Sequence, residues 1–226
     1  MRSRTRAIPM SSCARSTFPT LISSFHSSPT GRIVWGSAMP KQRIHSLRDS
    51  LLLDGGSLAG SYFHRSVVLV CQHDASGAFG LVLNRPDDRP LRDVLDVHLP
   101  DNLGAMLLAH GGPVQETAMS FLRSDPAMLS ANVMDHLQLG HDLEELIDLG
   151  QSWIPGRRLR VFAGYAGWSP GQLDDELRRE AWIVHPATLD LVFDVTPTAL
   201  WRQILKSRSD WKERILADAP DNPSSN

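Results

Sequence analysis

A serine flanked by glycines is the first candidate for a catalytic group in this sequence. Residues 167–171 read Gly-Trp-Ser-Pro-Gly and match the G-x-S-x-G pattern that carries the nucleophile of many hydrolases. Those enzymes take half of the oxyanion hole from the backbone N–H of the residue after the serine, but Pro170 has no N–H. The last histidine, His185, also follows Ser169 too closely for the usual order of serine, acid and histidine. The pattern therefore does not predict a nucleophile.

The same segment fits the start of a helix better. Ser169 and Gln172 have the spacing of a capping box, and Pro170 suits the first helical position. We therefore expect a helix over residues 170–179 with Ser169 as its cap. Glycines before this helix would bring backbone donors near a bound anion. The chain has no G-x-x-x-x-G-K pattern of a nucleotide P-loop, and we expect no cofactor.

Polar residues also stand at the ends of two predicted strands. His73 and Asp74 end the first strand, and Asn84 and Arg85 end the second. Hairpin pairing places the two groups apart, so they do not form one constellation. Cys71 and His73 share a strand face and offer two metal ligands, but no third ligand follows from the spacing, and no metal site is predicted.

No catalytic residue is assigned, and the candidates for ligand binding are polar strand ends and glycine-rich loops. Arg85 has three open interpretations: a bond to a loop carbonyl, a contact with the acidic helix, or a contact with an acidic ligand. The loops are residues 111–114 and 164–171, because function on a rigid sheet usually resides in its loops. The candidate residues are His73, Asp74, Asn84, Arg85, Gly111, Gly112, Gly164 and Trp168.

Apolar runs between turn residues predict the elements that would position these groups. Strands are expected over residues 51–53, 67–71, 79–83, 106–108, 119–122, 158–165 and 181–184, with residues 74–77 as a hairpin turn of about four residues. Helices are expected over residues 91–97, 142–149, 170–179 and 196–205, with Gly150 ending the second. Hairpins with irregularly interspersed helices indicate an α+β fold with a mixed sheet rather than a doubly wound parallel one.

Length and composition fit one soluble domain with tails. The chain has 226 residues, of which 42% are hydrophobic, and no apolar run approaches the roughly 18 residues needed to cross a bilayer. Two cysteines provide neither a disulfide framework nor a Cys-based zinc site, so a reducing, cytoplasmic setting without a membrane partner is expected. Residues 1–38 are predicted to be disordered or a spurious extension, with a transit peptide as an alternative, residues 39–210 one domain, and residues 211–226 a loose tail.

Charge argues against nucleic acid as the partner. Residues 1–38 contain five arginines and no acid, which leaves 18 basic and 25 acidic residues, a net charge of −7, for the remainder. A negative domain is repelled by a phosphate backbone. The one basic cluster, formed by Arg157, Arg158 and Arg160, suits a charged strand edge.

Four separate motifs carry a family resemblance. They are Val67-Val-Leu-Val-Cys-Gln-His-Asp74, Gly77-Ala-Phe-Gly-Leu-Val-Leu-Asn-Arg-Pro86, Gly111-Gly-Pro-Val114 and Gly164-Tyr-Ala-Gly-Trp-Ser-Pro-Gly-Gln-Leu173. In order and spacing they closely resemble the YqgE/AlgH family over roughly residues 51–205. The resemblance implies a mixed, largely antiparallel sheet that is partly curled into a barrel and flanked by helices. The family consists mostly of uncharacterised bacterial proteins, some labelled transcriptional regulators, and has no established catalytic residues.

Three classes of function follow from these observations. The favoured hypothesis is a non-enzymatic binding or regulatory domain that recognises a protein or a small molecule through its loops. The second is a transcriptional regulator that acts on DNA or through a protein partner. The third is an enzyme, of a hydrolytic kind, built around His73, Asp74, His110 or Ser169.

Overall fold

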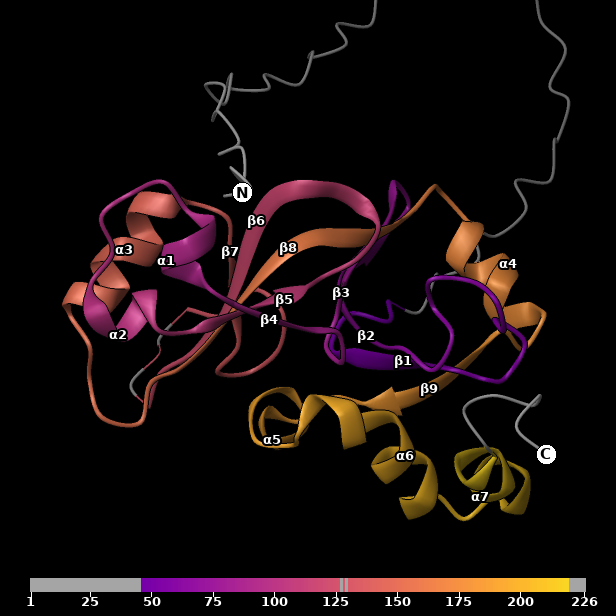
Figure 1. Ribbon diagram of the computed structural model, residues 1–226. Coiled ribbons are helices and arrows are strands. Elements are labelled where there is room, and N and C mark those ends of the chain that lie inside the picture. The colour runs from indigo at the N-terminus through magenta and orange to yellow at the C-terminus, as the bar shows by residue number, and fades with distance from the viewer. Residues whose placement is uncertain (1–45, 127, 129, 220–226) are drawn as a thin grey trace, which may run out of the picture. The chain divides into compact units, whose positions relative to one another are not determined.

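The computed structural model describes residues 46–126, 128 and 130–219 (Figure 1). The extension predicted over residues 1–38 lies outside this part of the chain. In chain order the described residues form β1 (Ser50–Asp54), β2 (Val67–Asp74), β3 (Gly77–Val82), β4 (Pro86–Pro90), α1 (Leu91–Val94), α2 (Asp101–Gly104), β5 (Leu107–His110), β6 (Val114–Ser124), β7 (Gln138–Gly140), α3 (Leu143–Gln151), β8 (Arg158–Trp168), α4 (Gln172–Arg178), β9 (Trp182–Pro186), α5 (Leu189–Phe193), α6 (Pro197–Ser207) and α7 (Trp211–Asp218).

The strands form one open, mixed sheet. Its order is β4-β5-β8-β3-β2-β1-β9, and β6 pairs with both β7 and β8. Only β5 and β8 pair in parallel, so the sheet is largely antiparallel and the predicted α+β class is confirmed. The partly closed barrel is wrong, because among the described strands β4 and β9 each have a single neighbour and end the sheet.

The central strands have apolar runs because both of their faces are covered. Side chains alternate across the sheet, so Leu51 and Leu69 pack with α6, while Leu52 and Val68 pack with α4 on the other face. A third apolar cluster joins α1, α2 and α3 to β5, β6 and β8. Figure 1 shows α1–α3 gathered at one end of the sheet, α4 and α7 at the other, and α5 and α6 below the sheet in this view.

The predicted hairpin is confirmed, with a tighter turn than expected. Asp74 pairs with Gly77, so Ala75 and Ser76 alone form the turn rather than four residues. The Asp74 carboxylate accepts a hydrogen bond from the Ser76 backbone N–H at 2.7 Å, which holds the turn closed.

Two helical predictions need correction. The helix expected over residues 91–97 is a single turn, α1, which ends at Val94, and the next turn, α2, lies beyond that range. Gly150 does not end α3, which continues to Gln151. Gly150 lies inside α3 because Leu103 and Pro100 pack closely against it, leaving little room for a side chain.

The C-terminal region is also more ordered than expected. Residues 211–218 form α7 in place of a loose tail, with Ala217 only 1% exposed. Lys206 of α6 and Asp218 of α7 form an ion pair at 2.8 Å, which links the two helices. Among the described helices, none has the length and hydropathy needed to span a membrane.

Candidate functional site

Asn84 and Arg85 hold the connection between β3 and β4 in place. The buried Asn84 side chain accepts from the Val67 N–H at 2.8 Å and donates to the Arg65 carbonyl at 2.8 Å. The Arg85 guanidinium donates to the His64 and Asn84 carbonyls, which is the first of its three interpretations. The guanidinium is partly removed from water, and this burial lowers the pKa of Arg85.

The contacts of Asn84 lead to a stability prediction. Asn84→Ala leaves a backbone donor and a backbone acceptor without partners, so the free energy of unfolding should fall by about 2 kcal/mol. Chemical denaturation measures the loss, with Gln151→Ala on the exposed end of α3 as the control. An unchanged stability of Asn84→Ala would show that Asn84 is free to serve a ligand instead.

His73 lies at the far end of the hairpin from Asn84, as the sequence predicts. Its imidazole Nδ1 accepts from the Leu47 N–H at 3.2 Å, and Nε2 lies 3.9 Å from the Asp174 carboxylate. The neighbouring Cys71 is buried, and this burial raises the pKa of its thiol. In the described part of the chain, no three His, Cys, Asp or Glu side chains are grouped to hold a metal ion.

The glycine-rich loops are packed closely against each other. Gly111 donates to the Ala163 carbonyl at 2.8 Å and accepts from the Val82 N–H at 2.8 Å. A Cβ atom on Gly112 would lie 2.1 Å from the Tyr165 carbonyl carbon, and one on Gly164 would lie 2.3 Å from the Gly112 oxygen. These three glycines therefore allow the β5–β6 connection to cross close over β8.

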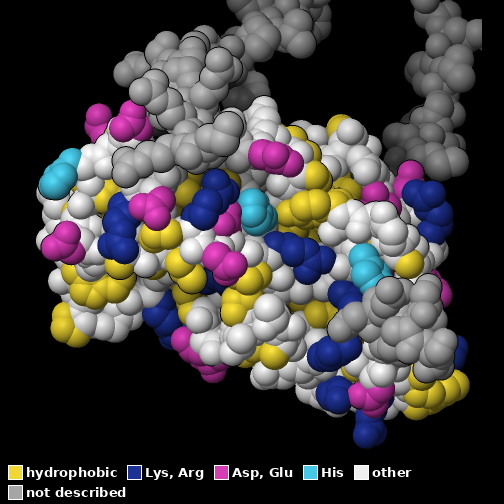
Figure 2. Space-filling view, viewed as in Figure 1, with side chains coloured by type: hydrophobic (Ala, Val, Ile, Leu, Met, Phe, Trp, Pro, Cys, Tyr) yellow, Lys and Arg dark blue, Asp and Glu magenta, His cyan; other side chains and the backbone are white. Residues whose placement is uncertain are grey.

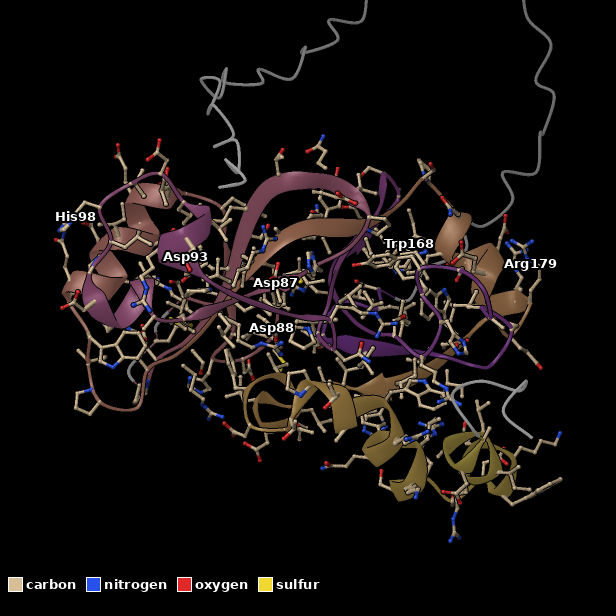
Figure 3. All side chains as sticks on the ribbon, in the orientation of Figure 1. Asp87, Asp88, Asp93, His98, Trp168 and Arg179 are labelled. Atoms are coloured by element: carbon tan, nitrogen blue, oxygen red, sulfur yellow. The ribbon has the colours of Figure 1, made fainter. Side chains whose placement is uncertain are left out.

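Trp168 closes β8 against α4 (Figure 3). Its indole Nε1 donates to the Glu176 carboxylate at 2.9 Å, and Trp182 donates to the same oxygen at 2.7 Å. The two indole rings meet edge to face with their centroids 6.2 Å apart. Glu176 thus joins α4 to the ends of β8 and β9.

Half of the expected capping box is present beside Trp168. The Gln172 side chain accepts from the Ser169 N–H at 3.1 Å, but the helix begins at Gln172 and its N-cap is Gly171, at φ 74°. The Ser169 hydroxyl therefore does not cap the helix. No histidine in the described chain is bonded to Ser169, so the residues of a catalytic triad are not assembled there.

Two side-chain pairs were not predicted, because their members are distant in the sequence. His110 Nε2 lies 3.2 Å from the carboxylate of Asp87, on β4 near the centre of Figure 3. Ser120 Oγ lies 2.9 Å from His141 Nδ1, and burial lowers the pKa of His141. Ser120 is only 3% exposed, so its hydroxyl is not open to a substrate.

Two hollows lie along β9, one of the two strands that end the sheet. The first hollow, of about 520 Å³, lies between the ends of β1 and β9 and residues 131–135. The second hollow, of about 410 Å³, lies between His185 and the α6–α7 connection. The first hollow is lined by Arg48, Asp49, Ser50, Ala131, Asn132, Val133, Met134, Asp135, Val184, Pro186 and Ala187. The second is lined by His185, Ser207, Arg208, Ser209, Asp210 and Glu213.

The backbone of β9 offers hydrogen bonds between these hollows. Gly55 donates to Ala181 and Ala187 donates to Asp49, which fixes the alternation of the β1–β9 ladder. In that alternation the N–H and C=O groups of Trp182 and Val184 face away from β1. Val184 is 36% exposed, and β9 has no other strand neighbour among the described residues. Successive side chains of β9 reach opposite faces, so Val184 lines the first hollow and His185 the second.

Arg208 sets the charge at this edge. Its guanidinium donates to the Val184 carbonyl at 3.1 Å and pairs with the Glu213 carboxylate. Burial and the Arg208 charge lower the pKa of His185, so the imidazole is neutral at pH 7. The outward-facing backbone of β9 and the two hollows beside it together suit the recognition of a backbone and its side chains.

Comparison with known proteins adds a family match. A family model described as AlgH-like matches residues 51–210. A UPF0301 protein of Cytophaga hutchinsonii is 35% identical over 184 residues, covering 79% of this chain and 98% of the relative. A UPF0301 protein of Streptomyces coelicolor is 36% identical over 193 residues, covering 81% and 97%.

Two solved structures have a similar fold. The solution structure of the AlgH protein from Pseudomonas aeruginosa matches with a TM-score of 0.62 at 26% identity, covering 81% of this chain and 100% of that protein. A crystal structure of a Corynebacterium diphtheriae protein matches with a TM-score of 0.59 at 24% identity, covering 76% and 91%, and carries information on the fold alone.

Proposed function

The chain belongs to the AlgH-like family, and on that premise we propose that it is a non-enzymatic binding domain that receives an extended segment of a protein partner along β9. The observation that carries the proposal is the outward-facing backbone N–H of Val184 between two hollows. A segment added to a sheet edge gains main-chain hydrogen bonds, while pockets for alternate side chains give specificity.

The side-chain chemistry favours binding over catalysis. A nucleophile needs a base within hydrogen-bond reach and an accessible position. Ser169 is bonded to no histidine among the described residues, and Ser120, which is bonded to one, is buried. His185 lines the second hollow together with Ser207 and Ser209, but among the described residues its imidazole is bonded to neither hydroxyl.

The basic cluster supports a protein partner over DNA. Arg157 pairs with Asp125 at 2.7 Å, and Arg158 pairs with Asp194 at 2.8 Å. Arg160 is largely buried and donates to the Val192 and Leu83 carbonyls, and this burial lowers its pKa to about 10. These three cations are engaged inside the domain, and the net charge of −7 outside residues 1–38 repels a phosphate backbone. A regulatory role would accordingly act through a protein.

Removing one backbone donor tests the proposal. Val184→Pro deletes an N–H that faces away from β1, so the β1–β9 ladder keeps its bonds while the added strand loses one. The full chain captures a partner from native lysate, and the affinity of that partner is then measured for each variant. We expect Val184→Pro to bind at least about tenfold more weakly.

Val184→Thr keeps the backbone N–H and a β-branched side chain, so it is the matched control and should bind within about twofold of wild type. Thermal unfolding of both variants verifies that the fold is retained. Equal affinity for Val184→Pro and Val184→Thr would contradict strand addition at β9, as would the recovery of a small molecule alone.

A further inference from the structure

The outward face of α7 carries the two most exposed large apolar side chains of the described chain. Trp211 is 65% exposed and Ile215 is 62% exposed, and one helical turn separates them, so they lie on the same face. The opposite face anchors the helix, because Ala217 is buried and Leu216 packs on the core. The apolar pair is therefore held outward by a helix that is fixed from behind.

Basic side chains accompany this apolar pair. Lys212 and Arg214 are exposed, and neither forms an ion pair with another described residue. The acids of α7 are already occupied, since Glu213 pairs with Arg208 and Asp218 pairs with Lys206. Figure 2 shows hydrophobic and basic side chains, with an acidic one among them, at the end of the molecule where α7 lies.

The net charge of the region around α7 is opposite in sign to that of the rest of the domain. Residues 197–218 contain five basic and three acidic residues, whereas the chain beyond residue 38 has a net charge of −7. A local positive patch on an acidic domain selects an acidic partner. The partner must also accept an indole and an isoleucine side chain.

We propose that the outward face of α7, defined by Trp211, Lys212, Arg214 and Ile215, binds the surface of an anionic lipid bilayer. Indole rings favour the boundary between headgroups and acyl chains, and lysine and arginine bind the lipid phosphates above it. The face is the convex side of a helix, which a soft bilayer surface accommodates without a complementary pocket. Such contact is peripheral and reversible, and it departs from the expectation of no membrane partner drawn from hydropathy alone.

Vesicle sedimentation of the full chain tests this proposal. Vesicles of phosphatidylcholine with one quarter phosphatidylglycerol should bind the protein at low salt, and vesicles of phosphatidylcholine alone should not. Binding should fall at high salt because exposed charges are screened. The double variant Trp211→Ala, Ile215→Ala should reduce the partition coefficient at least about fivefold, as should Lys212→Glu with Arg214→Glu.

Matched variants separate α7 from other contributions. The arginines of residues 1–38 are present in the wild type and in every variant. A difference in vesicle binding between the wild type and an α7 variant therefore comes from α7. Leu107→Ala removes a side chain that is 56% exposed on β5 and should leave vesicle binding unchanged. Val184→Pro should also leave it unchanged, which keeps this test independent of strand addition at β9. Thermal unfolding verifies that each variant is folded.

Three results would overturn the proposal. The first is no sedimentation with the phosphatidylglycerol vesicles. The second is sedimentation that the α7 variants leave unaltered, which would assign the binding to another part of the chain. The third is binding to an acidic polypeptide such as polyglutamate, dependent on Trp211, without binding to vesicles, which would make the occupant a protein.

Discussion

Gly112→Ala should lower the free energy of unfolding by at least about 3 kcal/mol, the largest loss expected from a single methyl group in this chain. The new Cβ atom would lie 2.1 Å from the Tyr165 carbonyl carbon and 2.4 Å from the Ala166 nitrogen. Both contacts are with the backbone of β8, which is paired on both sides and has no room to move. The melting temperature should fall by roughly 6 to 12 °C for a chain of this length.

Gly60→Ala is the matched control for this substitution. Gly60 also has a positive φ, of 80°, but a Cβ atom there meets nothing within 4 Å. Gly60→Ala therefore has the backbone strain without the steric clash, and its free energy of unfolding should fall by about 1 kcal/mol. Equal melting temperatures for the two variants would refute the close packing of the glycine-rich loops. Those loops would then again be candidates for ligand binding.

Glu176→Ala should lower the free energy of unfolding by about 3 kcal/mol. The substitution removes the acceptor of two indole N–H groups, those of Trp168 and Trp182, which are 7% and 5% exposed. Each buried donor without a partner costs about 1 to 3 kcal/mol. Urea unfolding, followed by tryptophan fluorescence, measures both the stability and the environment of the two rings.

Two further variants interpret that result. Glu176→Gln keeps one side-chain oxygen as an acceptor, so its loss should be smaller than that of Glu176→Ala. Glu144→Ala on the exposed face of α3 should stay within about 0.5 kcal/mol of wild type. A stability of Glu176→Ala equal to that of Glu144→Ala would mean that the carboxylate does not join α4 to the sheet.

Local patterns predicted the paired central strands well, because their signals are confined to neighbouring residues. The apolar runs of residues 67–71 and 79–83, with polar turn residues between them, correspond to the β2–β3 hairpin. Whether the sheet closes into a barrel could not be predicted from these local patterns. A barrel and an open sheet can have the same strands, and they differ here because β9 and β4 lack a second neighbour in the part of the chain that the structure describes.

Helix ends were mispredicted where tertiary contacts override local preference. Gly150 usually signals the end of a helix, but here it gives the room for α3 to pack on Leu103. Residues 211–218 read as a tail because their apolar pattern is weak, yet a buried Ala217 and an ion pair to Lys206 fix α7 on α6. Neither contact is visible from the residues alone.

The edge at β9 was not predicted as a binding surface because a sequence does not reveal which strand ends a sheet. Residues 181–184 were correctly expected to form a strand, and nothing in their types separates them from an internal one. The hollows beside β9 are lined by segments far apart in the chain, such as Arg48 and Asp135. By contrast, the glycines that drew attention in the sequence serve the crossing of two backbones.

Amide hydrogen exchange at single-residue resolution, measured with and without a captured partner, tests binding along β9 most directly. An added strand bonds the N–H groups that face outward, so exchange at Trp182 and Val184 should slow at least about tenfold. Ile183 and His185 already face β1, and their exchange should not change. Slowed exchange at another surface, with all amides of β9 unaltered, would contradict the proposed function.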